Sequence, residues 1–149
     1  MFGEKYILGR KQIKLDKAGR IILPTFTYAE PGEDVVFMIS NNMEYINLFS
    51  RNDISKKLNT LIEKQTEASS FNEYNTLQAQ INMIQNYCFG HSEVDGQRRV
   101  LIPKSLREKI LSGTDVFVNG AVALQLPCLE IYQSEEQMLK LNLRGKNFI

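Results

Sequence analysis

Two arginines follow short segments that each begin with an aspartate. Residues 16–19 are Asp-Lys-Ala-Gly and precede Arg20, and residues 95–98 are Asp-Gly-Gln-Arg and precede Arg99. A leading aspartate favours a tight turn because its side chain bonds the backbone that follows, and Gly19 adopts a positive φ without steric cost. An arginine just past such a turn can make paired bonds to phosphate or to guanine O6 and N7. The alternative is a structural turn with a solvated arginine.

The charge distribution supports an anionic partner. The 18 Lys and Arg residues nearly balance the 17 Asp and Glu residues, but residues 5–20 contain six basic residues and one acidic residue. Residues 98–109 contain five basic residues and one acidic residue, whereas residues 21–97 contain four basic and ten acidic ones. Scattered, solvated charge on two faces is the alternative, but both basic segments coincide with a repeated turn, which favours contact with nucleic acid. The candidate contacts are Lys14, Lys17, Arg20, Arg98 and Arg99, and the candidate turn-forming residues are Asp16, Gly19 and Asp95.

An internal repeat relates the two turns. The aspartate, the arginine and a following proline recur 79 positions apart, the pairs being Asp16 and Asp95, Arg20 and Arg99, and Pro24 and Pro103. With small gaps, the match continues at residues 34–35 against 115–116 and at residues 46–49 against 129–132. Such self-similarity predicts two copies of one β-rich unit.

Each copy is expected to contain a strand, a turn, a strand, a proline-started helical turn and two further strands. Residues 35–39 and 116–118 are β-branched or aromatic, which is typical of strands, and residues 104–111 are expected to form a short helix. Between the copies, apolar residues at helical spacing predict two bridging helices, the second beginning with a capping box at Ser70. Ser134 begins a last helix in the same way.

These patterns predict one α+β domain with pseudo-twofold symmetry. Residues 1–51 form the first repeat, residues 52–88 the helical bridge, and residues 89–149 the second repeat with the C-terminal helix. A half of about 45 residues buries too little apolar surface to fold alone. We therefore expect one joint β-barrel with the helices packed around it. Its core is expected to include the aromatic residues Phe37, Tyr45, Phe49, Phe117 and Tyr132.

The duplicated motif carries a family resemblance. Asp-x-x-Gly-Arg-x-x-x-Pro at residues 16–24 and Asp-x-x-x-Arg-x-x-x-Pro at residues 95–103 resemble the signature of the MraZ family, relatives of the AbrB-type swapped-hairpin DNA-binding proteins. The similarity spans essentially the whole chain and includes the Met-Phe start, the Leu-Arg pair at residues 106–107 and the segment at residues 129–132. The resemblance implies that Arg20 and Arg99 contact DNA and that Asp16 and Asp95 begin the turns.

The resemblance also implies a function. It suggests a repressor-like transcriptional regulator of the cell division and cell wall gene cluster, which binds promoter direct repeats as a ring-shaped homo-oligomer. The resemblance implies association with the nucleoid. A cytoplasmic location without membrane contact is expected because no apolar run approaches the ~18 residues of a membrane span and charged residues interrupt the first ten positions. The alternative is an AbrB-like antitoxin or scaffold, whose tail, here residues 141–149, captures a toxin partner.

Two positions depart from the family's pattern. Gly3 stands where an arginine is common, and Arg98 stands where the second turn would have a glycine. A non-glycine residue in the left-handed region costs roughly 1–2 kcal/mol. We therefore expect the second turn to be reshaped, with Gly96 supplying the flexibility, and Arg99 to be held less firmly than Arg20.

The sequence offers little for catalysis. His91 is the only histidine, and Cys88 lies three residues before it. A structural cysteine and a surface histidine explain this pair, because neither a four-ligand zinc site nor a phosphate-binding glycine loop can be assembled around it. Cys88 and Cys128 are expected to be free thiols. No enzymatic activity, metal or cofactor is expected.

Overall fold

The computed structural model describes residues 1–145, and the predicted tail residues 146–149 lie outside this range. The strands are β1 (Arg10–Lys14), β2 (Arg20–Ile22), β3 (Asp34–Ile39), β4 (Ile46–Ser50), β5 (Cys88–Glu93), β6 (Arg99–Leu101), β7 (Asp115–Ala123) and β8 (Leu126–Tyr132). The helices are the short 3-10 helix η1 (Thr25–Thr27) and the α-helices α1 (Arg51–Thr66), α2 (Phe71–Tyr87), α3 (Lys104–Ile110) and α4 (Glu135–Gly145). The predicted α+β class is confirmed.

Six strands form one sheet, in the order β1-β7-β8-β4-β3-β5, and every neighbouring pair is antiparallel. Within residues 1–145, β2 and β6 pair only with each other and form a separate two-stranded ribbon. The predicted joint β-barrel is wrong, because β1 and β5 remain edge strands and the sheet does not close. Closure would need hydrogen bonds between β1 and β5. Instead, each edge strand continues into a strand of the ribbon: β1 leads to β2, and β5 leads to β6.

Strands from the two halves of the chain interleave. The first half, residues 1–51, supplies β1 and β3, and the second half, residues 89–145, supplies most of β5 and all of β7. β1 pairs with β7, β5 pairs with β3, and the ribbon strand β2 pairs with β6. The two halves therefore complete each other's strand pairs.

The main hydrophobic core joins the ribbon to the sheet. It includes Ile21 and Val100 from the ribbon together with Phe37, Leu48 and Leu129 from the sheet. Ile21 is 1% exposed and Val100 is fully buried. Burial of an aliphatic side chain of this size contributes about 1.5–3 kcal/mol. The inner face of the ribbon is thus fixed, and its outer face is left to solvent.

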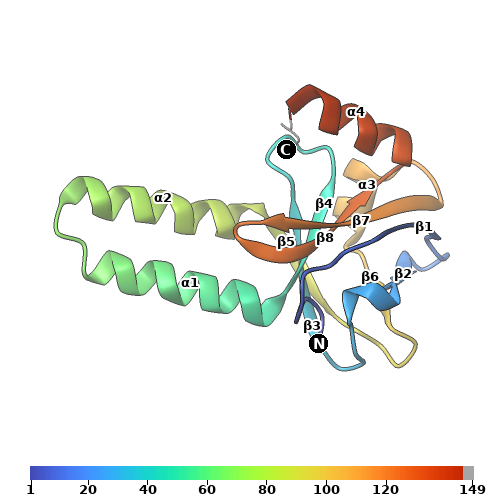
Figure 1. The fold of residues 1–149 in the computed structure, drawn as a ribbon, viewed down its shortest axis with the longest axis horizontal. Coiled ribbons are helices and arrows are strands. Elements are labelled where there is room, and N and C mark those ends of the chain that lie inside the picture. The colour runs from blue at the N-terminus through green and yellow to red at the C-terminus, as the bar shows by residue number, and fades with distance from the viewer. Residues whose placement is uncertain (146–149) are drawn as a thin grey trace.

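The two predicted bridging helices are present as a hairpin, α1 and α2, that projects away from the strands (Figure 1). Ser70 Oγ accepts a hydrogen bond from the backbone N–H of Glu73 at 3.1 Å, as the capping box predicts. Leu61 and Ile84 of the hairpin pack with Val36 of β3, which attaches it to the sheet. No helix in residues 1–145 combines the length and the apolar character needed to cross a membrane.

The other predicted helical segments are also present. The helix η1 follows Pro24, and α3 follows Pro103, at equivalent positions of the repeat. Ser134 Oγ accepts a hydrogen bond from the Gln137 N–H at 3.1 Å and caps the start of α4. The missing N–H of proline is not needed in the first turn of a helix, which explains why both prolines stand there.

Most of the aromatic residues predicted for the core are buried. Phe37, Phe49, Phe117 and Tyr132 are between 0% and 4% exposed. Tyr45 is half-buried and stacks on Tyr132, with 4.7 Å between the ring centroids. These rings are therefore occupied by packing and do not form a platform for stacking bases.

Candidate nucleic-acid interface

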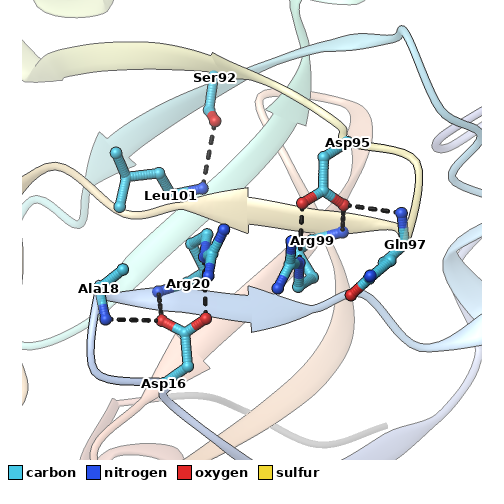
Figure 2. Close-up of polar contacts among 8 residues, drawn as sticks. All are labelled: Asp16, Ala18, Arg20, Ser92, Asp95, Gln97, Arg99 and Leu101. Atoms are coloured by element: carbon cyan, nitrogen blue, oxygen red, sulfur yellow. Dashed lines mark hydrogen bonds and ion pairs between the residues drawn. The ribbon is translucent and has the colours of Figure 1, made fainter.

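One carboxylate organises the first turn. Asp16 Oδ1 accepts hydrogen bonds from the backbone N–H groups of Ala18 at 2.9 Å and Arg20 at 2.8 Å. Its Oδ2 accepts a bond from Arg20 Nε at 2.8 Å (Figure 2). The N–H of Gly19 donates to the Asp16 carbonyl oxygen at 3.0 Å and closes the turn. Asp16 therefore shapes the turn and also orients the guanidinium group that follows it.

The second turn repeats each of these bonds. Asp95 Oδ1 accepts from the backbone N–H groups of Gln97 at 2.9 Å and Arg99 at 2.8 Å, and Oδ2 accepts from Arg99 Nε at 2.8 Å (Figure 2). The N–H of Arg98 donates to the Asp95 carbonyl oxygen at 2.9 Å. The two turns thus share one geometry, although only the first has glycine at its fourth position.

Arg98 itself adopts the left-handed conformation that the second turn requires. Its φ is 59°, where the φ of Gly19 is 92°, and Gly96 is not among the glycines with positive φ. The expectation of a turn reshaped around Gly96 is therefore wrong. The bonds to Asp95, together with the Leu23 N–H that donates to the Arg98 carbonyl oxygen at 2.8 Å, fix the position. The turn tolerates the cost of roughly 1–2 kcal/mol for a side chain in this region.

Arg99 is held as firmly as Arg20. Both Nε–Oδ2 distances are 2.8 Å, and the Arg99 side chain is 25% exposed where that of Arg20 is 36% exposed. The expectation that Arg99 would be held less firmly than Arg20 is wrong. The orientation of Arg99 depends on its bond to Asp95 and not on the residue at position 98. Each guanidinium group is therefore oriented by the aspartate of its own turn.

Strand pairing brings both arginines to one side of the ribbon. β2 and β6 are antiparallel, with Ile21 directly opposite Val100. Successive side chains of a strand point to opposite faces. Because Ile21 and Val100 face the core, Arg20 and Arg99, one position before each of them, lie on the outer face. Figure 2 shows the two arginines close together on the paired strands.

Both guanidinium groups keep donors for a ligand. Arginine carries several N–H donors in a fixed planar fork. In the part of the chain that the structure describes, only the Nε–H of Arg20 and of Arg99 is bonded to a protein acceptor. The Nη atoms at the outer end of each fork are therefore available. This is the end that makes paired bonds to guanine O6 and N7.

The aspartates remain ionised near neutral pH. The backbone N–H of Arg20 lowers the pKa of Asp16 below its ordinary value, and the Arg20 side chain lowers it further. The N–H and side chain of Arg99 lower the pKa of Asp95 in the same way. Each carboxylate thus stays a hydrogen-bond acceptor and keeps its guanidinium group oriented.

The remaining predicted contacts lie around the ribbon. Lys14 ends β1, Lys17 lies in the first turn, Arg98 lies in the second, and all three are exposed. Lys14 and Arg98 line a groove of about 440 Å³, whose walls also include Lys11 and Ile22. The second turn is therefore placed beside β1 of the first half, so that basic residues from the two halves share one groove.

Arg107 is a basic residue at this site that the sequence analysis left without a role. It lies on α3, and its Nε donates to the carbonyl oxygen of Ile102 at 2.9 Å. Its guanidinium group occupies the space that a side chain at position 19 would need. Gly19 is therefore required both for its positive φ and for this contact. The pairing of Leu106 with Arg107 was noticed in the sequence, but spacing alone could not place α3 against the first turn.

The residues considered for catalysis form no reactive pair. His91 is exposed on the edge strand β5, and Cys88 begins the same strand. Burial raises the pKa of the Cys88 thiol, whereas an activated cysteine needs a lowered one. Cys88 and Cys128 are both free thiols. Across residues 1–145, no group of three or more His, Cys, Asp or Glu side chains is placed to hold a metal ion.

Comparison with known proteins gives little support for any family. No protein-family model matches the chain, and no curated protein matches it. One solved structure, the solution structure of PHS018 from Pyrococcus horikoshii, is 18% identical and covers 87% of this chain and 97% of its own, with a TM-score of 0.34. A similarity at this level supports no inference about fold or function.

Proposed function

We propose that this chain is a sequence-specific DNA-binding transcriptional regulator of the MraZ type, built from two copies of a swapped-hairpin unit. The observation that carries the proposal is the two-stranded ribbon, which presents two arginines on one face, each oriented by an aspartate through an Nε–Oδ2 bond of 2.8 Å. Such a ribbon fits the major groove of B-form DNA, which is about 12 Å wide.

The proposed mechanism divides the work between base contacts and phosphate contacts. Arg20 and Arg99 read guanine through their Nη groups, while Asp16 and Asp95 fix the direction of each fork. Lys14, Lys17 and Arg98 are exposed beside the ribbon and are suited to contacts with the phosphate backbone. Phosphate contacts supply affinity, and the two arginines supply sequence preference.

The swapped-hairpin duplication is supported by the reciprocal bonds of the ribbon. The Leu23 N–H donates to the carbonyl oxygen of Arg98 at 2.8 Å, and the Ile102 N–H donates to that of Gly19 at 3.0 Å. Both donors and both acceptors are related by the same offset of 79 positions. Each half thus donates one hydrogen bond to the other half and accepts the equivalent bond in return.

The resemblance to the MraZ family suggests the biological setting. We propose that the chain acts at the nucleoid on promoter direct repeats of the cell division and cell wall gene cluster, as a ring-shaped homo-oligomer. One chain carries one ribbon and almost no net charge, so several linked ribbons would be needed for strong binding. The alternative, an antitoxin or scaffold, depends on the chain's tail, of which residues 146–149 lie outside the described range.

A mobility-shift assay on the DNA upstream of the protein's own gene tests the proposal. We expect binding that weakens steeply as salt rises, because phosphate contacts release counterions. Arg20→Ala is expected to lower affinity tenfold or more, whereas Lys56→Ala, an exposed cation on α1 in the helical hairpin, is the matched control and should bind as the unmodified protein does. Equal affinities for the two folded variants would remove Arg20 from the DNA site.

A further inference from the structure

Two aliphatic side chains share the outer face of the ribbon with the arginines. Ile22 is 58% exposed and Leu101 is 47% exposed, and they stand at equivalent positions, 79 residues apart. Leu101 lies directly opposite Arg20, and Ile22 lies directly opposite Arg99. The outer face therefore carries two arginines and two aliphatic residues. Each arginine lies opposite an aliphatic residue of the neighbouring strand.

This exposure is specific to the outer face. Ile21 and Val100, the neighbours of these residues on the same strands, are at most 1% exposed. A single exposed aliphatic side chain is ordinary on a protein surface. Here, however, two of them occupy corresponding positions beside positioned cations, on a ribbon whose register is set by the buried pair. The pattern indicates that the aliphatic residues belong to the same contact surface as the arginines.

The surroundings of Ile22 identify the chemistry of the partner. Lys11, Lys14 and Arg98 line the groove in which Ile22 lies. A partner that approaches Ile22 therefore also meets several positive charges. In the major groove of DNA, the C5-methyl group of thymine is an apolar feature of a base edge and is flanked by phosphates. A surface that combines aliphatic side chains with cations is complementary to this arrangement.

We propose that Ile22 and Leu101 contact thymine methyl groups in the major groove, a specificity that rests on the DNA-binding function proposed above. Each half of the ribbon then reads two kinds of base. The oriented arginine selects guanine. The aliphatic residue opposite it selects thymine at a neighbouring base pair. Both contacts are made by side chains whose backbone is fixed by the buried Ile21 and Val100.

The test removes the methyl group and leaves the rest of the DNA unchanged. The probe is the duplex from upstream of the protein's own gene, compared with the same duplex in which every thymine is replaced by uracil. Loss of one buried methyl contact is expected to lower affinity about fourfold, and loss of two about tenfold or more. The unmodified protein should therefore bind the uracil duplex at least four times more weakly than the thymine duplex.

Variants assign this effect to the two residues. Ile22→Ala and Leu101→Ala should each reduce the difference between the two duplexes, and the double variant should bind both equally. Ile62→Ala is the matched control, because Ile62 is an aliphatic residue of α1 that is 48% exposed. This control should keep the full difference. Circular dichroism of each variant checks that the fold is retained.

The outcomes separate this inference from the function on which it rests. Equal binding of the two duplexes by the unmodified protein would overturn the thymine contact and leave DNA binding intact. A double variant that keeps the full difference would remove Ile22 and Leu101 from the contact. A double variant that keeps this difference and dissociates in sedimentation would assign the aliphatic pair to an interface between copies. Failure to bind either duplex would overturn the proposed function itself.

Discussion

The two turns reach the same geometry with different residues at the fourth position. In the first turn Gly19 leaves space that the guanidinium group of Arg107 fills, whereas in the second turn Arg98 stands at that position itself. An arginine therefore lies beside the fourth position of the first turn (Arg107) and at the fourth position of the second (Arg98), in addition to the arginine that each aspartate orients. The comparison teaches that the missing glycine of the second motif costs stability but does not change the shape of the turn, because the aspartate determines that shape.

The strands that precede the two turns differ more than the turns do. β1 carries Arg10, Lys11 and Lys14, and the residues 79 positions later on β5 are Phe89, Gly90 and Glu93. β1 therefore supplies cations that β5 lacks; two of them, Lys11 and Lys14, line the groove to which the second half adds Arg98. We expect base contacts to be shared equally between the halves and phosphate contacts to be concentrated beside β1.

The largest expected effect tests the equivalence of the two arginines. Arg20→Ala and Arg99→Ala should each lower DNA affinity tenfold or more and by similar factors, because both guanidinium groups are oriented by the same set of bonds. The measurement is a titration of each folded variant on the same duplex. A much smaller loss for Arg99→Ala would show that the shared geometry does not produce a shared role.

Gly19→Ala should destabilise the protein by about 2 kcal/mol. The substitution forces a side chain into a φ of 92° and also displaces Arg107. Gly32→Ala is the matched control, because Gly32 has a φ of 89° but no neighbouring atom within 4 Å of the added methyl group. Urea unfolding of the two variants separates the cost of the backbone from the cost of the contact. Equal losses would mean that Arg107 moves aside freely.

Arg98→Gly should stabilise the protein by about 1 kcal/mol, because glycine adopts the left-handed conformation without strain. The gain is less than the full strain, because glycine also gives the unfolded chain more conformational freedom. The same change should reduce the slope of log affinity against log salt by about one, since one cation is removed from the groove. Urea unfolding and a salt titration measure the two effects. A less stable variant would contradict the strain argued for Arg98.

The smallest expected effect concerns pH. The folded chain lowers the pKa of Asp16 and Asp95, so their contribution to the free energy of unfolding is present above the ordinary aspartate pKa of 3.8 and is lost as the pH falls through the lowered values. Unfolding measured between pH 6 and pH 3 should show this loss. The double variant Asp16→Asn, Asp95→Asn should show a weaker dependence below pH 4. An unchanged slope would mean that the carboxylates do not stabilise the turns.

The repeat predicted more of the site than of the fold. The offset of 79 identified both aspartates, both arginines and both prolines, because tight turns depend on local residues. The order of the strands could not be derived in this way. Whether β1 pairs with a strand of its own half or with β7 depends on contacts over about a hundred residues, and period-two patterns do not encode the partner.

Two features of the site were also beyond the sequence. The cost of a left-handed arginine predicted a reshaped turn, but the hydrogen bonds around Asp95 outweigh this cost in the folded chain. Arg107 contacts the first turn because α3 packs there, which no spacing in the sequence indicates. Local preferences therefore predicted the elements, and tertiary contacts decided how residues from different elements meet.

The interleaving of the two halves also determines when, during synthesis, the strand pairs can form. β1 and β2 are synthesised long before their partners in the structure, which are β7 and β6. Contacts between residues so distant in the chain slow folding, because a long loop must close before they form. The first turn can gain its partner strand only after residues 99–101 have been made. A chain that ends before residue 101 therefore cannot present the ribbon, and the surface with both arginines arises only after the second turn and β6 have been made.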